Sequence, residues 1–95
     1  MFLVLLRFGD NKAAAPDHMA GHQDWIQQGI RDGVFLLVGS LKPGLGGAVL
    51  AAGTDRDQLG QRVAGDPFVV HDVVTAEIVE IEPNFTDPRL SFLAG

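Results

Sequence analysis

Residues 16–47, PDHMAGHQDWIQQGIRDGVFLLVGSLKPGLGG, decide the fold, because they join an amphipathic helix to an apolar strand and a glycine-rich turn. At about 100° per residue, one side of this helix collects apolar and small residues around His22: Met19, Trp25, Ile26, Gly29, Ile30 and Gly33. Pro16 suits the first helical turn, and Gly33 suits the left-handed position that ends a helix. The sequence therefore places His22 in the middle of the face that packs on a sheet.

Apolar runs and turn signals outside the first helix give the order of the remaining elements. Four runs predict strands: residues 2–8, 34–38, 48–52 and 69–82. Thr54 fits the N-cap of a second helix, which carries Leu59 and Val63 and ends at Gly65. In the fourth strand the apolar parity changes partway, which indicates a bulge or a change of the buried side. The tail beyond Pro83 is too apolar for a free tail.

This order is that of an α+β, ferredoxin-like βαββαβ domain with an antiparallel four-stranded sheet, and residues 1–95 make one such domain. Right-handed crossovers place both helices on the same face of the sheet. The first two strands are apolar on both faces, so the uncovered face needs another layer. A second copy of the chain is the simplest layer, and we expect a homodimer.

Composition excludes several function classes. A net charge of −5, with 7 scattered basic residues, disfavours nucleic acid as a partner. The absence of Cys removes disulfides, thiolate metal sites and cysteine nucleophiles. The apolar run near the N-terminus is too short to span a membrane, and no basic region precedes it. We expect a cytoplasmic protein without membrane or nucleic-acid partners.

His22 and Asp66 are the candidates for chemistry. Asp66 begins the segment Asp66-Pro67-Phe68 between the second helix and the fourth strand, where a carboxylate can reach the cleft between helix and sheet. A histidine oriented by a carboxylate is poised as a general acid or base near neutral pH. The alternatives are a His22 bonded to a backbone carbonyl and an Asp66 that serves only the turn before Pro67.

Further candidates are weaker. Arg7, Trp25, Ser40 and Phe68 are expected to contact a substrate, although Arg7 can equally be a solvated strand end and Trp25 a core or cleft-wall residue. His18 and His22 are four residues apart on the helix, with His71 as a possible third metal ligand. No carboxylate on the same helix completes that set, and we predict no metal site. The turn at residues 44–47 leads into a strand and so lacks the helix N-terminus that binds phosphate; we expect it to be a mobile hairpin tip beside the cleft.

The spacing of these motifs resembles that of the YciI-related family of the dimeric α/β-barrel superfamily. The resemblance rests on His22, Gly33 eleven residues later, Gly39 six residues after that, and the Asp66-Pro67-Phe68 segment. It implies a ferredoxin-like homodimer whose cleft holds a His–Asp pair at His22 and Asp66.

The chain departs from the family pattern at three places. Met19 stands where relatives often have a basic residue, Ser40 where they often have Pro, and His71-Asp72 where they have small residues. The first departure argues against an anionic substrate held by the helix. We expect a cofactor-independent enzyme that performs isomerase- or lyase-like proton transfer on a small organic molecule. The alternative is a non-catalytic module that binds a small ligand in the same cleft.

Overall fold

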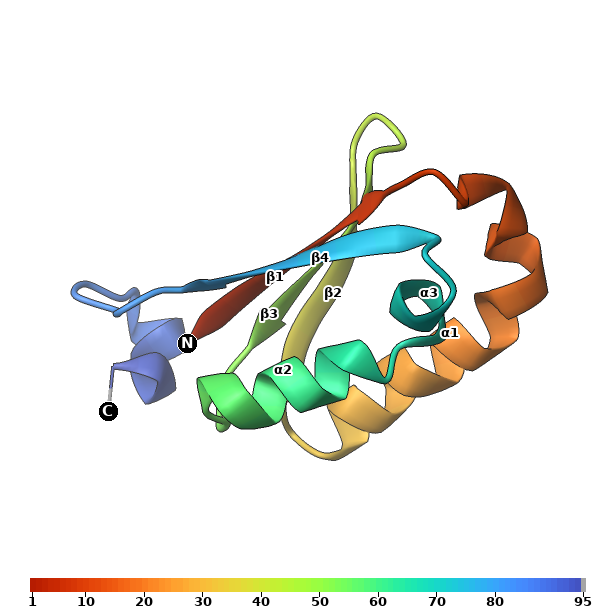
Figure 1. Cartoon of the computed structure of the whole chain (residues 1–95). Coiled ribbons are helices and arrows are strands. Elements are labelled where there is room, and N and C mark those ends of the chain that lie inside the picture. The colour runs from red at the N-terminus through yellow and green to blue at the C-terminus, as the bar shows by residue number, and fades with distance from the viewer. Residues whose placement is uncertain (95) are drawn as a thin grey trace.

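A computed structural model describes residues 1–94 as one layer of helices on one face of a four-stranded sheet (Figure 1). The elements are, in order, β1 (Phe2–Phe8), η1 (Lys12–Ala14), α1 (Ala15–Arg31), β2 (Phe35–Leu41), β3 (Gly46–Ala51), α2 (Arg56–Ala64), α3 (Pro67–Val70), β4 (Val74–Glu80) and η2 (Pro88–Leu93). The strand order is β2-β3-β1-β4, and all neighbouring strands are antiparallel. The predicted ferredoxin-like α+β fold is confirmed.

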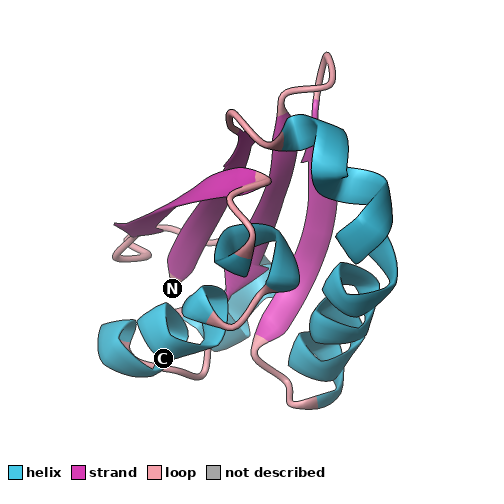
Figure 2. Ribbon diagram, turned by 45° about the vertical axis from the view of Figure 1, so that its right-hand side comes forward, coloured by secondary structure: helices cyan, strands magenta, loops and turns pink. Residues whose placement is uncertain are grey.

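The core lies between the sheet and the helices. Alternate residues of β1 point to the helical side and are buried, and they meet apolar residues of β3, α2 and α3 there: Phe2, Val4, Leu6, Val49, Ala51, Leu59, Val63 and Phe68. Figure 2 shows α1, α2 and α3 on this side of the sheet. The opposite face carries no other layer within residues 1–94. No helix in the described chain is long and apolar enough to cross a bilayer.

The first helix begins and ends close to the predicted positions. It starts at Ala15, next to Pro16, and the chain leaves it through Gly33, whose φ of +75° is the left-handed conformation that glycine adopts readily. Inside the helix, Gly29 is buried against Phe35: a Cβ at Gly29 would lie 2.1 Å from the Phe35 ring. This glycine lets α1 approach β2.

Several predicted boundaries were wrong. β2 continues to Leu41, beyond the predicted end at residue 38, and β3 begins at Gly46, before the predicted start at residue 48. The second helix is capped by Asp55, whose side chain accepts a hydrogen bond from the Gln58 amide at 2.8 Å, and not by Thr54. The predicted fourth strand at residues 69–82 begins only at Val74, because residues 67–70 form the short helix α3. Of the two explanations for the change of parity in this strand, the bulge is absent from β4, since β4 pairs with β1 in an unbroken register from Val74 to Glu80. The register shift within the described sheet lies instead in β2, between Phe35 and Leu37.

Candidate functional site

The structure brings His22 and Asp66 into direct contact, although they are 44 residues apart in the chain. His22 comes from α1 and Asp66 from the N-cap of α3, and the His22 Nδ1 atom lies 2.7 Å from Asp66 Oδ1. The Asp66 side chain is fully buried, while the His22 side chain keeps 14% of its surface exposed. A charged residue is therefore buried at the base of a histidine that is still accessible to a small molecule.

Local backbone chemistry sets the position of Asp66. Its Oδ1 atom also accepts a hydrogen bond from the Phe68 amide at 3.0 Å, which caps α3, and Pro67 occupies the first helical position. Gly21 of α1 faces Pro67, and a Cβ at Gly21 would lie only 3.1 Å from the proline ring. The missing side chain at Gly21 thus allows α1 and α3 to come close enough for the His22–Asp66 hydrogen bond.

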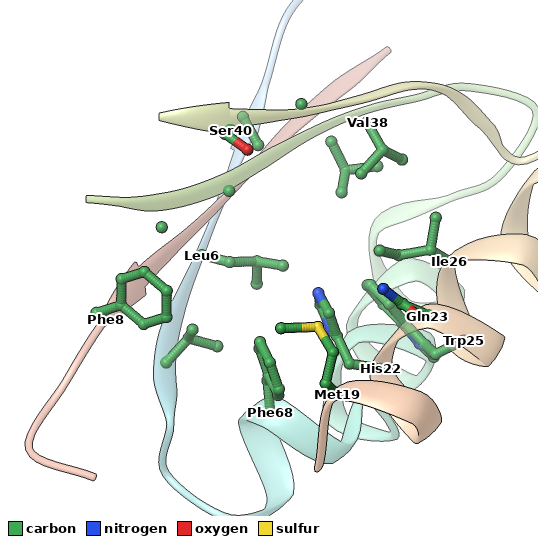
Figure 3. A pocket seen from close by; sticks show the side chains of 16 residues that line it. Leu6, Phe8, Met19, His22, Gln23, Trp25, Ile26, Val38, Ser40 and Phe68 are labelled. Atoms are coloured by element: carbon green, nitrogen blue, oxygen red, sulfur yellow. The ribbon is translucent and has the colours of Figure 1, made fainter. Parts of the chain in front are cut away.

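Two aromatic rings lie beside the His22 imidazole. The Phe68 ring stacks on it at a centroid distance of 3.9 Å and an interplanar angle of 2°, and the Trp25 ring lies at 5.9 Å and 20°. Trp25 is held in turn by a hydrogen bond from its Nε1 to the Arg62 carbonyl at 2.9 Å. With one face covered by Phe68 and Nδ1 bonded to Asp66, the Nε2 edge is the polar part of the ring left for a ligand (Figure 3).

The second oxygen of Asp66 is a further feature of the site. Asp66 Oδ2 is buried and has no hydrogen-bond partner among residues 1–94. The carboxylate has one neighbour that can carry a positive charge by gaining a proton, namely the His22 ring at Oδ1. Asp66 is therefore placed to orient the imidazole and to stabilise the imidazolium that forms when Nε2 takes up a proton.

Nε2 faces a cavity of about 300 Å³ between α1 and the sheet. Figure 3 shows its 16 lining residues, which include three of the four predicted contact residues, Trp25, Ser40 and Phe68. Gly46 lines the sheet side of the cavity without a side chain. Its φ is +135°, and a Cβ there would lie 1.9 Å from the Leu6 carbonyl oxygen, so this position requires glycine. Gln23 also lines the cavity and was missed in the sequence, since it sits next to His22 at the border of the apolar helix face.

The fourth predicted contact residue, Arg7, does not reach this cavity. In β1 the even-numbered residues point to the helices, so Arg7 lies on the open face of the sheet. There its guanidinium forms an ion pair with Glu77 of β4 at 2.8 Å. The parity of this strand could not be read from the sequence, because residues 2–6 are apolar at every position.

The three histidines do not form a common metal site. His18 and His71 stack face to face at 3.8 Å and 7°, so their in-plane lone pairs lie in parallel planes and do not converge on one point. His22 uses Nδ1 for Asp66. Across residues 1–94, no three His, Cys, Asp or Glu side chains are grouped as metal ligands.

Fold and site together define a ferredoxin-like α+β protein with a buried His–Asp pair at the base of a small cavity. No family model matches the chain, and no curated protein does. Among solved structures, the chain is similar to 5-chloro-2-hydroxyhydroquinone dehydrochlorinase from Burkholderia phenoliruptrix, determined in complex with 2,5-dihydroxybenzoquinone. The identity is 14%, the TM-score is 0.68, and the match covers 85% of this chain and 93% of that enzyme. This likeness shows the shared fold.

Proposed function

We propose that this protein is a small enzyme that uses His22 as a general acid and base, with Asp66 as its orienting partner. The observation that carries the proposal is the 2.7 Å contact between His22 Nδ1 and Asp66 Oδ1, which leaves Nε2 at the cavity. In such a reaction Nε2 removes a proton from a C–H or O–H group of the substrate, and the same proton is then returned to another atom or lost to water. This chemistry is isomerase- or lyase-like and needs no cofactor.

The structural neighbour supports this reaction class. Dehydrochlorination, the reaction in its name, is an elimination in which a base removes a proton while chloride leaves with its electron pair. One histidine and one carboxylate supply the base and the counter-charge for that step. We therefore propose small hydroxylated or carbonyl-bearing rings as the first compounds to test.

We also propose that the protein belongs to the YciI-related family and works as a homodimer. Away from the Arg7–Glu77 ion pair, the open face of the sheet carries apolar residues, namely Leu3, Leu5, Leu37, Leu50 and Val79, and Leu37 is 59% exposed. A second copy that covers this face would bury these residues. Light scattering tests this proposal: the expected mass is about twice the 10.1 kDa of one chain, and Leu37→Glu should dissociate the dimer.

A matched control for the dimer test is Val70→Glu, because Val70 is 57% exposed but lies in α3 on the helical side. This variant should stay dimeric. A parent protein that is monomeric at micromolar concentration, or a Val70→Glu variant that dissociates as readily as Leu37→Glu, contradicts the proposed dimer.

Proton exchange tests the enzyme proposal directly, because it requires only the first step of the reaction, the removal of a proton by the base. A panel of phenols, hydroquinones and cyclic ketones, which are uncharged at neutral pH, is incubated with the protein in D₂O, and loss of C–H signals is followed by proton NMR. We expect His22→Gln to slow the exchange of any active compound by about 10²–10⁴-fold, because glutamine cannot accept and return a proton. His18→Gln is the control, since His18 stacks on His71 outside the cavity, and it should keep the parent rate.

The same experiment separates the enzyme from a non-catalytic binding module. Trp25 is the one tryptophan of the chain and lines the cavity, so its fluorescence reports binding directly. A compound that binds the parent by this signal, without any exchange above the uncatalysed rate, favours the binding module. An exchange rate that His22→Gln leaves unchanged contradicts the role of His22.

A further inference from the structure

Among the described side chains that line the cavity, His22 is the one that can carry a charge. The lining contains no Asp, Glu, Lys or Arg within the described chain, and its polar side chains are those of His22, Gln23 and Ser40. The remaining lining residues are apolar or glycine. A charged group that entered this space would lose water without gaining an ion pair from the walls.

The nearest buried charge works against an anion in particular. Asp66 is fully buried directly behind His22, with its Oδ2 atom unpartnered, so its negative charge is balanced at most by one proton on the imidazole. Three basic side chains have contacts of their own. Arg62 pairs with Asp32 at 2.9 Å and Arg7 pairs with Glu77 at 2.8 Å, while the Lys12 ammonium lies over the ring of Phe8, a lining residue, at 4.8 Å from its centroid. The carboxyl group behind His22 therefore offers an anion no electrostatic attraction at the base of the cavity.

The geometry of the walls also limits how a ligand can meet His22. Phe68 covers one face of the imidazole and Asp66 takes Nδ1, so Nε2 is the ring nitrogen at which a polar group of the ligand can bond, in the plane of the ring. Gln23 on α1 and Ser40 on β2 line the same cavity from two different elements and offer a second polar contact. The volume of about 300 Å³ is at the lower end of the range for ligand pockets.

From these observations we propose that the cavity selects uncharged ligands of about the size of one ring, and rejects anions of the same shape. One hydroxyl or carbonyl group of the ligand lies at Nε2 of His22, and its apolar body contacts the aromatic and aliphatic walls. This inference deepens the proposed function and rests on it in one respect, namely that Nε2 of His22 is the group that meets the ligand.

Benzamide and benzoate provide a matched pair of probes, because they share shape and size and differ in charge at pH 7. Each is titrated into the parent protein, and binding is followed by the fluorescence of Trp25 with excitation selective for tryptophan. We expect benzamide to bind at least tenfold more tightly than benzoate. Benzoate binding as tightly as benzamide, or no binding of benzamide at millimolar concentration, overturns the proposal.

A second variant tests the electrostatic cause. Ser40 is an exposed lining residue on β2, and Ser40→Lys places a cation at the cavity without disturbing the core. Because Ser40 also lines the cavity, the readout is the ratio of the two affinities: this variant should raise the affinity for benzoate relative to that for benzamide by at least tenfold compared with the parent. A Ser40→Lys variant that shows no relative gain for benzoate contradicts the electrostatic explanation.

The His22→Gln variant makes the two proposals fail independently. Because glutamine is neutral, this variant should keep the preference for benzamide even where it has lost proton exchange. A kept preference together with unchanged proton exchange refutes the catalytic role of His22 alone. A lost preference in the parent, together with exchange that depends on His22, refutes the ligand class alone.

Discussion

Gly29→Ala tests the packing of α1 on β2, which holds the cavity wall in place. A Cβ at this position would lie 2.1, 2.3 and 2.7 Å from three atoms of the Phe35 ring, whereas ordinary contacts begin at 3.4 Å. The ring must therefore move by about 1.3 Å, the difference between 3.4 and 2.1 Å. Phe35 is only 3% exposed, and the Trp25 ring packs edge-on against it with the ring centroids 4.9 Å apart. The Phe35 ring therefore has no free space into which it can move.

The expected loss of stability follows from two opposing terms. Overpacking of a core costs typically 1–3 kcal/mol, and a displacement of this size against a buried ring belongs at about 3 kcal/mol. Alanine in place of glycine inside a helix returns about 1 kcal/mol through its higher helix propensity. The net loss is about 2 kcal/mol, which lowers the melting temperature by about 8–16 °C for a domain of this size.

Gly60→Ala is the matched control for this prediction. Gly60 lies inside α2, and a Cβ there would meet nothing within 4 Å. This variant should gain about 1 kcal/mol, because only the propensity term acts. Both variants are compared with the parent by urea unfolding and thermal circular dichroism at one fixed protein concentration. A Gly29→Ala protein as stable as Gly60→Ala refutes the packing argument.

The remaining predictions concern the site and its surroundings. Gly21→Ala should weaken the His22–Asp66 contact, because the added Cβ pushes α3 away by a few tenths of an ångström. The rate of proton exchange should fall, while circular dichroism shows that the fold is intact. An unchanged exchange rate contradicts this prediction. Asp66→Asn should keep the cap of α3 yet lower exchange by about 10²–10⁴-fold, and ¹⁵N NMR of the imidazole should show an altered tautomer population. Spectra and rates like those of the parent refute the coupling of His22 and Asp66. The Arg62 guanidinium holds the pKa of Asp32 below its ordinary value of 3.8. The stability that this ion pair contributes is therefore present above that pH and is lost as the pH falls through the lowered pKa. On acidification, Arg62→Gln should accordingly lose less of its free energy of unfolding than the parent does.

The topology could be predicted from the sequence because the strong signals agree with one another. The helix stripe around His22, the glycine at position 33 and the apolar runs at residues 2–8 and 34–38 all point to the same layer arrangement. The boundary at residues 67–70 could not be predicted in this way. Val69 and Val70 are β-type residues, and a four-residue helix is too short to show a helical period.

In the site, too, some residues could be predicted from the sequence pattern, while others depend on how the helices pack. His22 and Asp66 could be proposed because an apolar helix face and an Asp-Pro segment are both visible in the sequence. The stacking of Phe68 on His22 depends on the direction of α3, which the sequence did not predict. Arg7 was misplaced because nothing in a strand that is apolar at every position reveals which side faces the helices.

The burial of Asp66 costs the folded protein stability, and this cost argues for a role of Asp66 in chemistry. It is the one fully buried charged side chain among the described residues, and its Oδ2 atom makes no hydrogen bond. Burial of an unsatisfied polar atom costs about 1–3 kcal/mol, and more when the group is charged. The cap of α3 needs only an oxygen acceptor, which an asparagine or a serine supplies without a charge. The carboxylate is thus unnecessary for the turn, and its distinctive contribution is a negative charge 2.7 Å from His22 Nδ1. A negative charge at that distance stabilises an imidazolium, which matters for proton transfer at Nε2 and not for the packing of α1.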